Sequence, residues 1–185
     1  MRPLPTETEL LTVEDYRATP EGSRYQLFEG ELSMAPAPNL QHQMIVWNLS
    51  QIFGRHLEKH PAGRMFFAPC DVYLSEHNVV QPDVLFVAKS RLGILSEDGV
   101  HGAPDLVVEV LSPSTAQLDT RTKRRLYAKH GVKELWLVDP SLLQIQRYDF
   151  ARAAAKPVQL IAEAERFKTA LLPGLTLTAA EIFRR

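Results

Sequence analysis

The segment from Leu106 to Leu111 contains five apolar residues and a single carboxylate, that of Glu109. An almost wholly apolar run of this length is typical of a strand that is buried on both faces. The segment therefore predicts a strand in the interior of a sheet, with one acid in its middle.

The residues after this run predict a strand, helix, strand crossover. Ser114 or Thr115 would cap a helix that continues to about His130, Gly131 would end it, and 134–138 would return as a strand. Further short strands are predicted at 65–68, 71–74, 84–87, 143–148 and 158–161, and a terminal helix at 179–183. These elements predict an α/β (α+β) protein built on a mixed β-sheet.

Three elements are predicted in the N-terminal third. Thr12 and Asp15 have the spacing of a capping box, which indicates a short helix over 12–16. The segments 25–29 and 31–35 flank Gly30 as a hairpin. Apolar residues recur at helical spacing from 39 to 60, the longest helix. No internal repeat is present, so we expect a single domain over 1–185.

Composition excludes several classes of protein. The 185 residues carry a formal net charge of -1, so no global basic field draws the chain to nucleic acid or to anionic membranes. Cys70 is the single cysteine, which rules out an internal disulfide and favours a reducing compartment. Because no signal-like start and no long apolar window occur, we expect a soluble, cytoplasmic protein without a membrane partner.

Charge is nevertheless distributed unevenly along the chain. Residues 1–35 have a net charge of -4, whereas residues 117–133 have a net charge of +5. This asymmetry indicates that any site for a polyanion is local.

Two acids are candidate functional residues. Glu109 would be costly to bury alone, so it either reaches water or an arginine at a strand end, or serves as a metal ligand or catalytic acid. Asp83 follows Pro82 at the start of another predicted strand, where turn chemistry is the simpler interpretation. Carboxylates from two neighbouring strands, however, supply the oxygen ligands that Mg²⁺ prefers.

The predicted helix before His130 carries the third candidate. On an α-helical wheel, Lys123 lies between Leu126 and Tyr127, inside the apolar arc. Its aliphatic stem could snorkel or its amine could pair with Asp119, but it could also face the two acids and assist a nucleophilic water. The wheel places three arginines on the outward side, as a strip that suits a phosphate backbone or a solvated face: Arg121, Arg124 and Arg125.

Several segments together resemble a known family. They are YQLFEGEL at 25–32, His42, QPDV at 81–84, APDLVVEVLSPST at 103–115, the helix with Lys123 and Tyr127, and GVKELWLVDP at 131–140. Over most of the chain they resemble the PD-(D/E)XK nuclease superfamily. The similar branch is a widespread prokaryotic group of restriction-endonuclease-like proteins, once described as a domain of unknown function.

This resemblance implies a fold, an activity and site residues. The fold is a restriction-endonuclease-like mixed sheet flanked by helices, with an N-terminal β-hairpin extension. The activity is hydrolysis of DNA phosphodiester bonds that depends on Mg²⁺ (or Mn²⁺), and Asp83 and Glu109 are the motif acids. Nucleases of this fold often cut duplex DNA as homodimers.

The chain departs from the pattern of the superfamily at two positions. Leu111 stands where the motif lysine is usual, which agrees with a lysine moved to the helix at Lys123. Gln26 stands where the branch commonly has an acid, and a neutral amide cannot neutralise a metal. Whether Glu29 compensates is open. His42 resembles a recurrent histidine of the branch, and a helix histidine with satisfied hydrogen bonds is the alternative.

The leading hypothesis is a metal-dependent DNA endonuclease. Asp83 and Glu109 hold the metal, and Lys123 assists the attacking water. The further supporting candidates are Gln26, Glu29, His42, Gln81, Asp119 and Tyr127. The rival hypothesis is a non-catalytic module with the nuclease fold, which binds nucleic acid or a protein partner through the basic strip. A hydrolase of another phosphoester would use the same residues.

Overall fold

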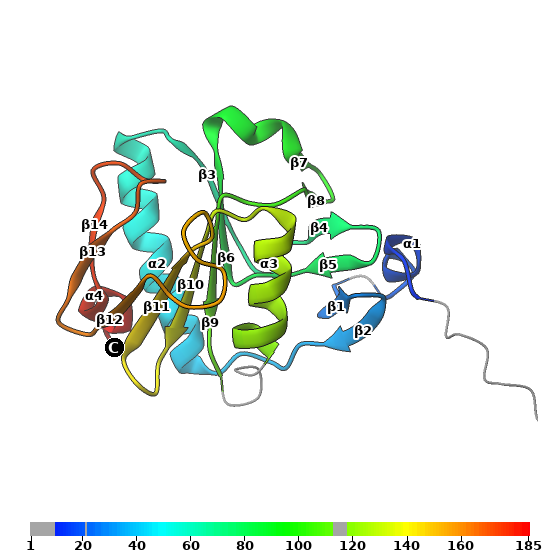
Figure 1. Cartoon of the computed structure of the whole chain (residues 1–185), viewed down its shortest axis with the longest axis horizontal. Coiled ribbons are helices and arrows are strands. Elements are labelled where there is room, and N and C mark those ends of the chain that lie inside the picture. The colour runs from blue at the N-terminus through cyan, green and yellow to red at the C-terminus, as the bar shows by residue number, and fades with distance from the viewer. Residues whose placement is uncertain (1–9, 21, 113–117) are drawn as a thin grey trace, which may run out of the picture.

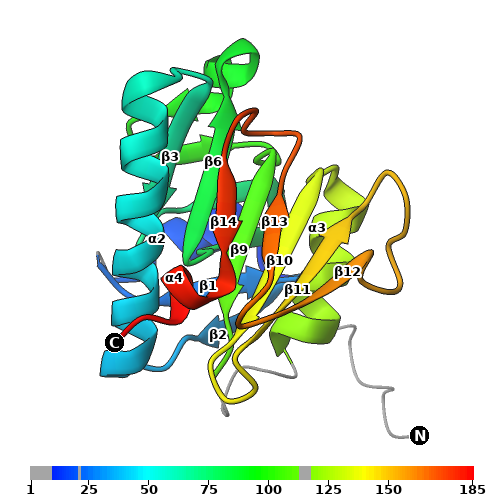
Figure 2. The same ribbon diagram turned by 90° about the vertical axis from the view of Figure 1, so that its left-hand side faces the viewer.

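The computed structural model describes residues 10–20, 22–112 and 118–185, and a six-stranded mixed sheet forms its centre (Figures 1 and 2). Strands β9 and β10 run parallel, and all other neighbours run antiparallel. The spatial order is β12 (Gln159–Ala162), β11 (Gln144–Asp149), β10 (Glu134–Asp139), β9 (Leu106–Val110), β6 (Val84–Ala88) and β3 (Gly63–Phe67). The mixed sheet and the doubly buried strand at 106–110 are confirmed.

Apolar clusters cover both faces of the central sheet. One face packs against α2 (Leu40–Lys59), α4 (Ala179–Phe183) and the small sheet of β13 (Arg166–Lys168) and β14 (Thr176–Thr178). Helix α3 (Arg124–His130) packs against the other face. Because side chains alternate along a strand, Val108 faces α2 while Val107 and Glu109 face α3.

Helix α2 begins and ends where its sequence predicts. The side chain of Asn39 caps it by accepting a hydrogen bond of 2.8 Å from the backbone N–H of His42. Ile45, Leu49 and Phe53 recur every four residues and bury one stripe against the sheet. The cap therefore also fixes the first turn, which carries His42.

The predicted hairpin is present, but it belongs to a second sheet of six strands. The order is β2 (Glu31–Met34), β1 (Tyr25–Phe28), β5 (Asn78–Val80), β4 (Val72–Ser75), β8 (Gly99–His101) and β7 (Leu95–Ser96). Helix α1 (Val13–Arg17) packs beside it, and the 3-10 helix η1 (Lys89–Ile94) leads from β6 to β7. The strands β5, β7 and β8 were not predicted, because two or three residues show no periodicity.

The crossover between β9 and β10 differs from the predicted single α-helix. The predicted cap at Ser114 or Thr115 lies outside the described residues. Residues Leu118–Lys123 form a π-helix, η2, and the α-helical part begins only at Arg124. A π-helix has wider turns than an α-helix, so an α-helical wheel misplaces side chains in this segment. Gly131, with φ of 91°, ends α3 as predicted.

Among the described helices, none combines the length and the apolarity needed to cross a membrane.

Candidate active site

The antiparallel register of β6 and β9 brings the two predicted acids to the same end of the sheet. Val84 pairs with Val108, so the residue before β6 lies beside the end of β9. Oδ2 of Asp83 accepts a hydrogen bond of 2.7 Å from the backbone N–H of Val110. The carboxylate of Asp83 is thus anchored one residue beyond Glu109.

Glu109 is buried, with 2% of its surface exposed, and both of its carboxylate oxygens have partners. The ammonium Nζ of Lys123 lies 3.0 Å from Oε2, and the hydroxyl of Tyr127 donates a hydrogen bond of 2.5 Å to Oε1. Among the described side chains, the carboxylate of Glu109 is thus paired with a lysine and a tyrosine rather than with an arginine.

Lys123 is also buried, as the wheel indicates, and stands at the junction of η2 and α3. Its contact with Glu109 is an ion pair with 6% and 3% of the two side chains exposed. Breaking a buried pair by removing one partner typically costs about 3–5 kcal/mol, because it strands the other charge. The pair therefore fixes the positions of both side chains relative to each other.

A cavity of about 590 Å³ is lined by the two acids, by Lys123 and by the candidates Gln26 and His42. The loop of residues 35–39, between β2 and α2, forms part of its wall. Its polar and charged lining residues include Arg24, Gln26, His42, Gln81, Asp83, Glu109 and Lys123. Arg24 was not predicted, because an isolated arginine before a strand carries no signal in the sequence.

His42 connects helix α2 to the first acid. Its Nε2 lies 3.1 Å from Oδ2 of Asp83, and 13% of its side chain is exposed. Its Nδ1 is buried and has no hydrogen-bond partner among the described residues. His42 is therefore not a helix histidine with both ring nitrogens hydrogen-bonded, which was the alternative interpretation of the sequence.

Gln26 and Gln81 hold the hairpin against the strand that leads to Asp83. Oε1 of Gln26 accepts a hydrogen bond of 3.0 Å from the backbone N–H of Gln81. The side-chain amide of Gln81 donates to Asp71 at 2.8 Å and to the hydroxyl of Tyr16 at 3.3 Å. Burial and the hydrogen bond to Asp71 raise the pKa of Tyr16, so Tyr16 stays neutral. Asp71 and Tyr16 were not predicted.

One supporting candidate does not line this cavity. Glu29 is half exposed and forms an ion pair of 3.3 Å with Arg125, away from Asp83 and Glu109. It therefore supplies no third carboxylate to the cavity. Asp119 lies in η2, and its side chain is outside the described part of the structure.

The three arginines do not form one outward strip. Arg124 donates hydrogen bonds to the carbonyl oxygens of Thr120 and Ala154, and its guanidinium lies 5.6 Å from the centre of the Tyr148 ring. Only Arg121 and Arg125 of the three are exposed. Arg124 begins α3, and its contacts with residues of other segments leave it only partly exposed.

One buried acid that was not predicted lies at the opposite end of β9. Asp105 is fully buried, and its carboxylate lies 2.7 Å from Nζ of Lys133 and 3.1 Å from Arg91. Burial acts to raise the pKa of Asp105, but the ion pair with Lys133, the hydrogen bond from the Ala88 backbone and the ion pair with Arg91 hold it below its ordinary value. Asp105 is remote from the cavity and ties the strands together.

Comparisons with known proteins identify the family of this chain and a structural neighbour. A family model named Uma2 and described as "putative restriction endonuclease" matches residues 13–180. The chain belongs to the Uma2 family. The fold resembles the crystal structure of a "putative nuclease belonging to DUF820" from Anabaena variabilis, with a TM-score of 0.75 and 20% identity over 94% of this chain and 97% of that one. No curated protein matches. Membership of the Uma2 family supports a nuclease-like function, and the likeness to this neighbour shows the fold.

Proposed function

We propose that this chain is a metal-dependent nuclease that hydrolyses the phosphodiester bonds of DNA. The observation that carries the proposal is the meeting of Asp83, Glu109 and Lys123 at one cavity. Two acids from adjacent strands and a cation from the helical crossover are charges that suit catalysis at a phosphate. Membership of a family described as restriction endonucleases supports the same class of reaction.

The donor set of the cavity fits a hard divalent cation. Asp83 and Glu109 offer carboxylate oxygens, and Mg²⁺ is commonly held by one or two carboxylates, with water and substrate phosphate oxygens as the other ligands. Among the described residues no group of three or more potential metal-binding side chains gathers, so a site built from protein ligands alone is not favoured. When bound, Mg²⁺ or Mn²⁺ would supply Lewis-acid stabilisation of charge on the phosphate.

The described side chains suit distinct roles in this reaction. The Val110 N–H fixes the direction of Asp83, and Tyr127 fixes that of Glu109. We assign to Lys123 the orientation of the attacking water and the stabilisation of charge on the phosphate. The water oxygen forms a bond to phosphorus, one P–O bond of the substrate breaks, and a proton from the water ends on the leaving oxygen.

Metal titration and DNA cleavage on the same variants test this function. We expect calorimetry to detect Mn²⁺ and Mg²⁺ binding to the wild-type protein and to lose it in Asp83→Asn and Glu109→Gln, which keep the side-chain shapes. Nicking of supercoiled DNA should fall by about 100-fold or more, the scale of losing one electrostatic contribution at a transition state. Circular dichroism checks that each variant is folded.

Asp139→Asn is a matched control, because Asp139 ends β10 beside the end of β9 but is not among the residues that line the cavity. It should bind metal and cleave DNA as the wild type does. Cleavage within twofold of wild type in both acid variants contradicts the proposed site.

The second candidate function is a nuclease-fold module that binds nucleic acid or a protein without cleaving it. The neutral side chain of Gln26 favours this second candidate, since an amide at this position of the cavity wall offers a metal no negative charge. DNA binding that persists in EDTA, with no cleavage in Mg²⁺ or Mn²⁺, would select this candidate.

A further inference from the structure

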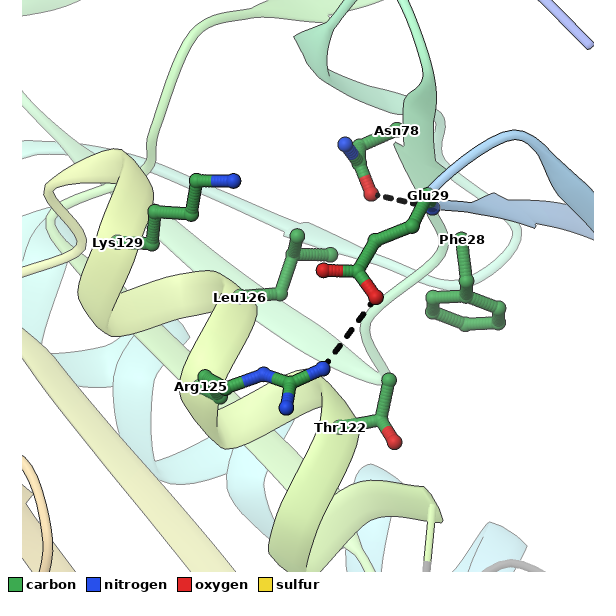
Figure 3. A pocket seen from close by; sticks show the side chains of 7 residues that line it. All are labelled: Phe28, Glu29, Asn78, Thr122, Arg125, Leu126 and Lys129. Atoms are coloured by element: carbon green, nitrogen blue, oxygen red, sulfur yellow. Dashed lines mark hydrogen bonds and ion pairs between the residues drawn. The ribbon is translucent and has the colours of Figure 1, made fainter. Parts of the chain in front are cut away.

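A second, smaller pocket of about 190 Å³ lies between the hairpin and helix α3 (Figure 3). Its lining residues are Phe28, Glu29, Asn78, Thr122, Arg125, Leu126 and Lys129. We call this hollow the Arg125 pocket. Its volume equals that of several water molecules, which take about 30 Å³ each in the liquid. A compact ionic group therefore fits in it.

The helical wall of the Arg125 pocket is positively charged. Arg125 and Lys129 are four residues apart, so they lie on the same face of α3 with Leu126 between them (Figure 3). Thr122 adds a hydroxyl at the Arg125 end of this wall, away from Lys129 (Figure 3). Two cations, a hydroxyl and an apolar floor form a suitable environment for a phosphate group.

The hairpin wall contributes the single acid of the pocket. Glu29 points toward α3, where its Oε2 lies 3.3 Å from Nη2 of Arg125 (Figure 3). Its backbone is fixed, because Glu29 and Gly30 both have positive φ in the hairpin turn, and Asn78 accepts the N–H of Glu29 at 2.9 Å. The carboxylate side chain is half exposed, so it can leave Arg125 without any movement of the backbone.

The Arg125 pocket lies next to the candidate active site. Gln26 lines the large cavity and Phe28 lines the small pocket, and these residues are two apart on the same face of β1. Two residues of a strand span about 7 Å. Phosphates of one nucleic-acid strand advance by about 3.4 Å each along the helix axis, so this spacing is on the order of one to two phosphate steps.

We propose that the Arg125 pocket binds a second phosphate of the nucleic-acid strand whose reacting phosphate lies in the large cavity. While no phosphate is bound, the carboxylate of Glu29 takes its place as the anion that pairs with Arg125. The inference rests on the proposed nuclease function. The incoming phosphate displaces the carboxylate of Glu29 from Arg125 and contacts Arg125 and Lys129. Binding at this pocket needs no metal, since among the described residues no acid besides Glu29 lines it.

Fluorescence anisotropy with a labelled DNA duplex in EDTA tests the pocket. Arg125→Ala combined with Lys129→Ala should weaken binding by about tenfold and reduce the slope of log Kd against log salt by about one to two. Glu29→Gln should tighten binding by about two- to fivefold, the scale of one exposed ion pair.

Matched controls separate the pocket from general charge effects. Arg152 is exposed and pairs with Asp149 at 3.3 Å, but it does not line the pocket, so Arg152→Ala should leave binding within twofold of wild type. Glu31→Gln removes the same charge from the same hairpin outside the pocket and should not reproduce the gain. The proposal would be overturned if Glu29→Gln and Glu31→Gln changed the affinity for DNA equally. It would also be overturned if the double variant weakened DNA binding no more than Arg152→Ala does.

A competition arm identifies the source of the phosphate. Inorganic phosphate at constant ionic strength should displace DNA from the wild type only weakly, and not from the double variant. Tight binding of inorganic phosphate with no binding of DNA would overturn the assignment to a nucleic-acid strand.

Failure of the pocket and failure of the proposed nuclease give different results. If DNA binds through the pocket but nothing is cut in any metal, the nuclease fails and the pocket stands. If the Arg125 and Lys129 variant cuts DNA with unchanged kcat and KM, the pocket alone fails. We expect a higher KM, an unchanged kcat and unchanged metal binding.

Discussion

At the residue scale, the candidate site depends on a carboxylate whose two oxygens are held by different donors. Glu109 contacts Lys123 through one oxygen and Tyr127 through the other, and all three side chains are buried. A hydrogen bond to an ionised group is stronger than one between neutral groups, and its loss leaves a buried charge with fewer partners. Tyr127 therefore orients the acid as well as stabilising it.

Removing this hydroxyl should be measurable in stability. We expect Tyr127→Phe to lower the free energy of unfolding by about 1.5–3 kcal/mol, the usual value for a hydrogen bond to a charged group. Tyr148→Phe is a control, since the Tyr148 hydroxyl donates to the neutral amide oxygen of Gln146 at 3.1 Å. Urea titration should show a clearly smaller loss for the control, and equal losses would contradict the role given to Tyr127.

At the scale of elements, the start of α2 links a helix cap to the site. Asn39 caps the helix through the N–H of His42, and the ring of the same histidine contacts Asp83. Loss of the cap frays the first turn and so loosens the ring beside the acid. One hydrogen bond at the helix end thereby supports both helix stability and the position of a site residue.

Substitution of the cap tests this link. Asn39→Ala should cost about 1 kcal/mol of unfolding free energy, whereas Asn39→Asp keeps an acceptor and should cost little. Thermal or urea unfolding compares the two variants. A loss of similar size in Asn39→Asp would show that the cap hydrogen bond is not the cause.

Elements with a long pattern could be predicted, and contacts between distant elements could not. The twenty residues of α2 and the apolar strand β9 have clear periodicity, whereas β7 has two residues. Asp83 and Glu109 were found as polar residues at otherwise apolar or strand-edge positions. The contact of His42 with Asp83 joins residues 41 positions apart and depends on the packing of α2 against the sheet, which no local pattern reveals.

The π-helical turn is the other feature that sequence patterns missed. Its hydrogen bonding leaves no simple compositional mark, so a regular α-helix was predicted over 118–123. The burial of Lys123 was still predicted correctly because α3, one residue later, keeps Leu126 and Tyr127 on the same inner face. Arg124 was misplaced because its partners lie in other segments.

At the scale of the whole molecule, Asp105 joins segments at the end of the sheet opposite the candidate site. Its side chain accepts a hydrogen bond from the backbone of Ala88, the last residue of β6, and pairs with Arg91 of η1 and with Lys133 before β10. Its backbone carbonyl also accepts from Lys133 and Glu134. One buried acid thus connects three elements, and its ionised form is the form that the fold requires.

Stability should therefore depend on pH through Asp105. Its pKa is lowered in the folded protein, so its contribution is present above the unfolded value of about 3.9 and is lost as pH falls through the folded pKa. We expect the unfolding free energy to fall below about pH 4, and Asp105→Asn to remove part of this dependence. Urea titrations from pH 3 to 7 measure it. An unchanged slope in Asp105→Asn would contradict this assignment.

The alternation of side chains along β9 limits how the gene for this protein can change in length. Val108 and Val110 face α2, while Glu109 faces Lys123 on the other side of the sheet. A deletion of one codon within this strand would turn the acid toward the α2 cluster and a valine toward the lysine. Insertions and deletions should therefore be tolerated in the loops but removed by selection in β9, even where the inserted or deleted residue is apolar like its neighbours.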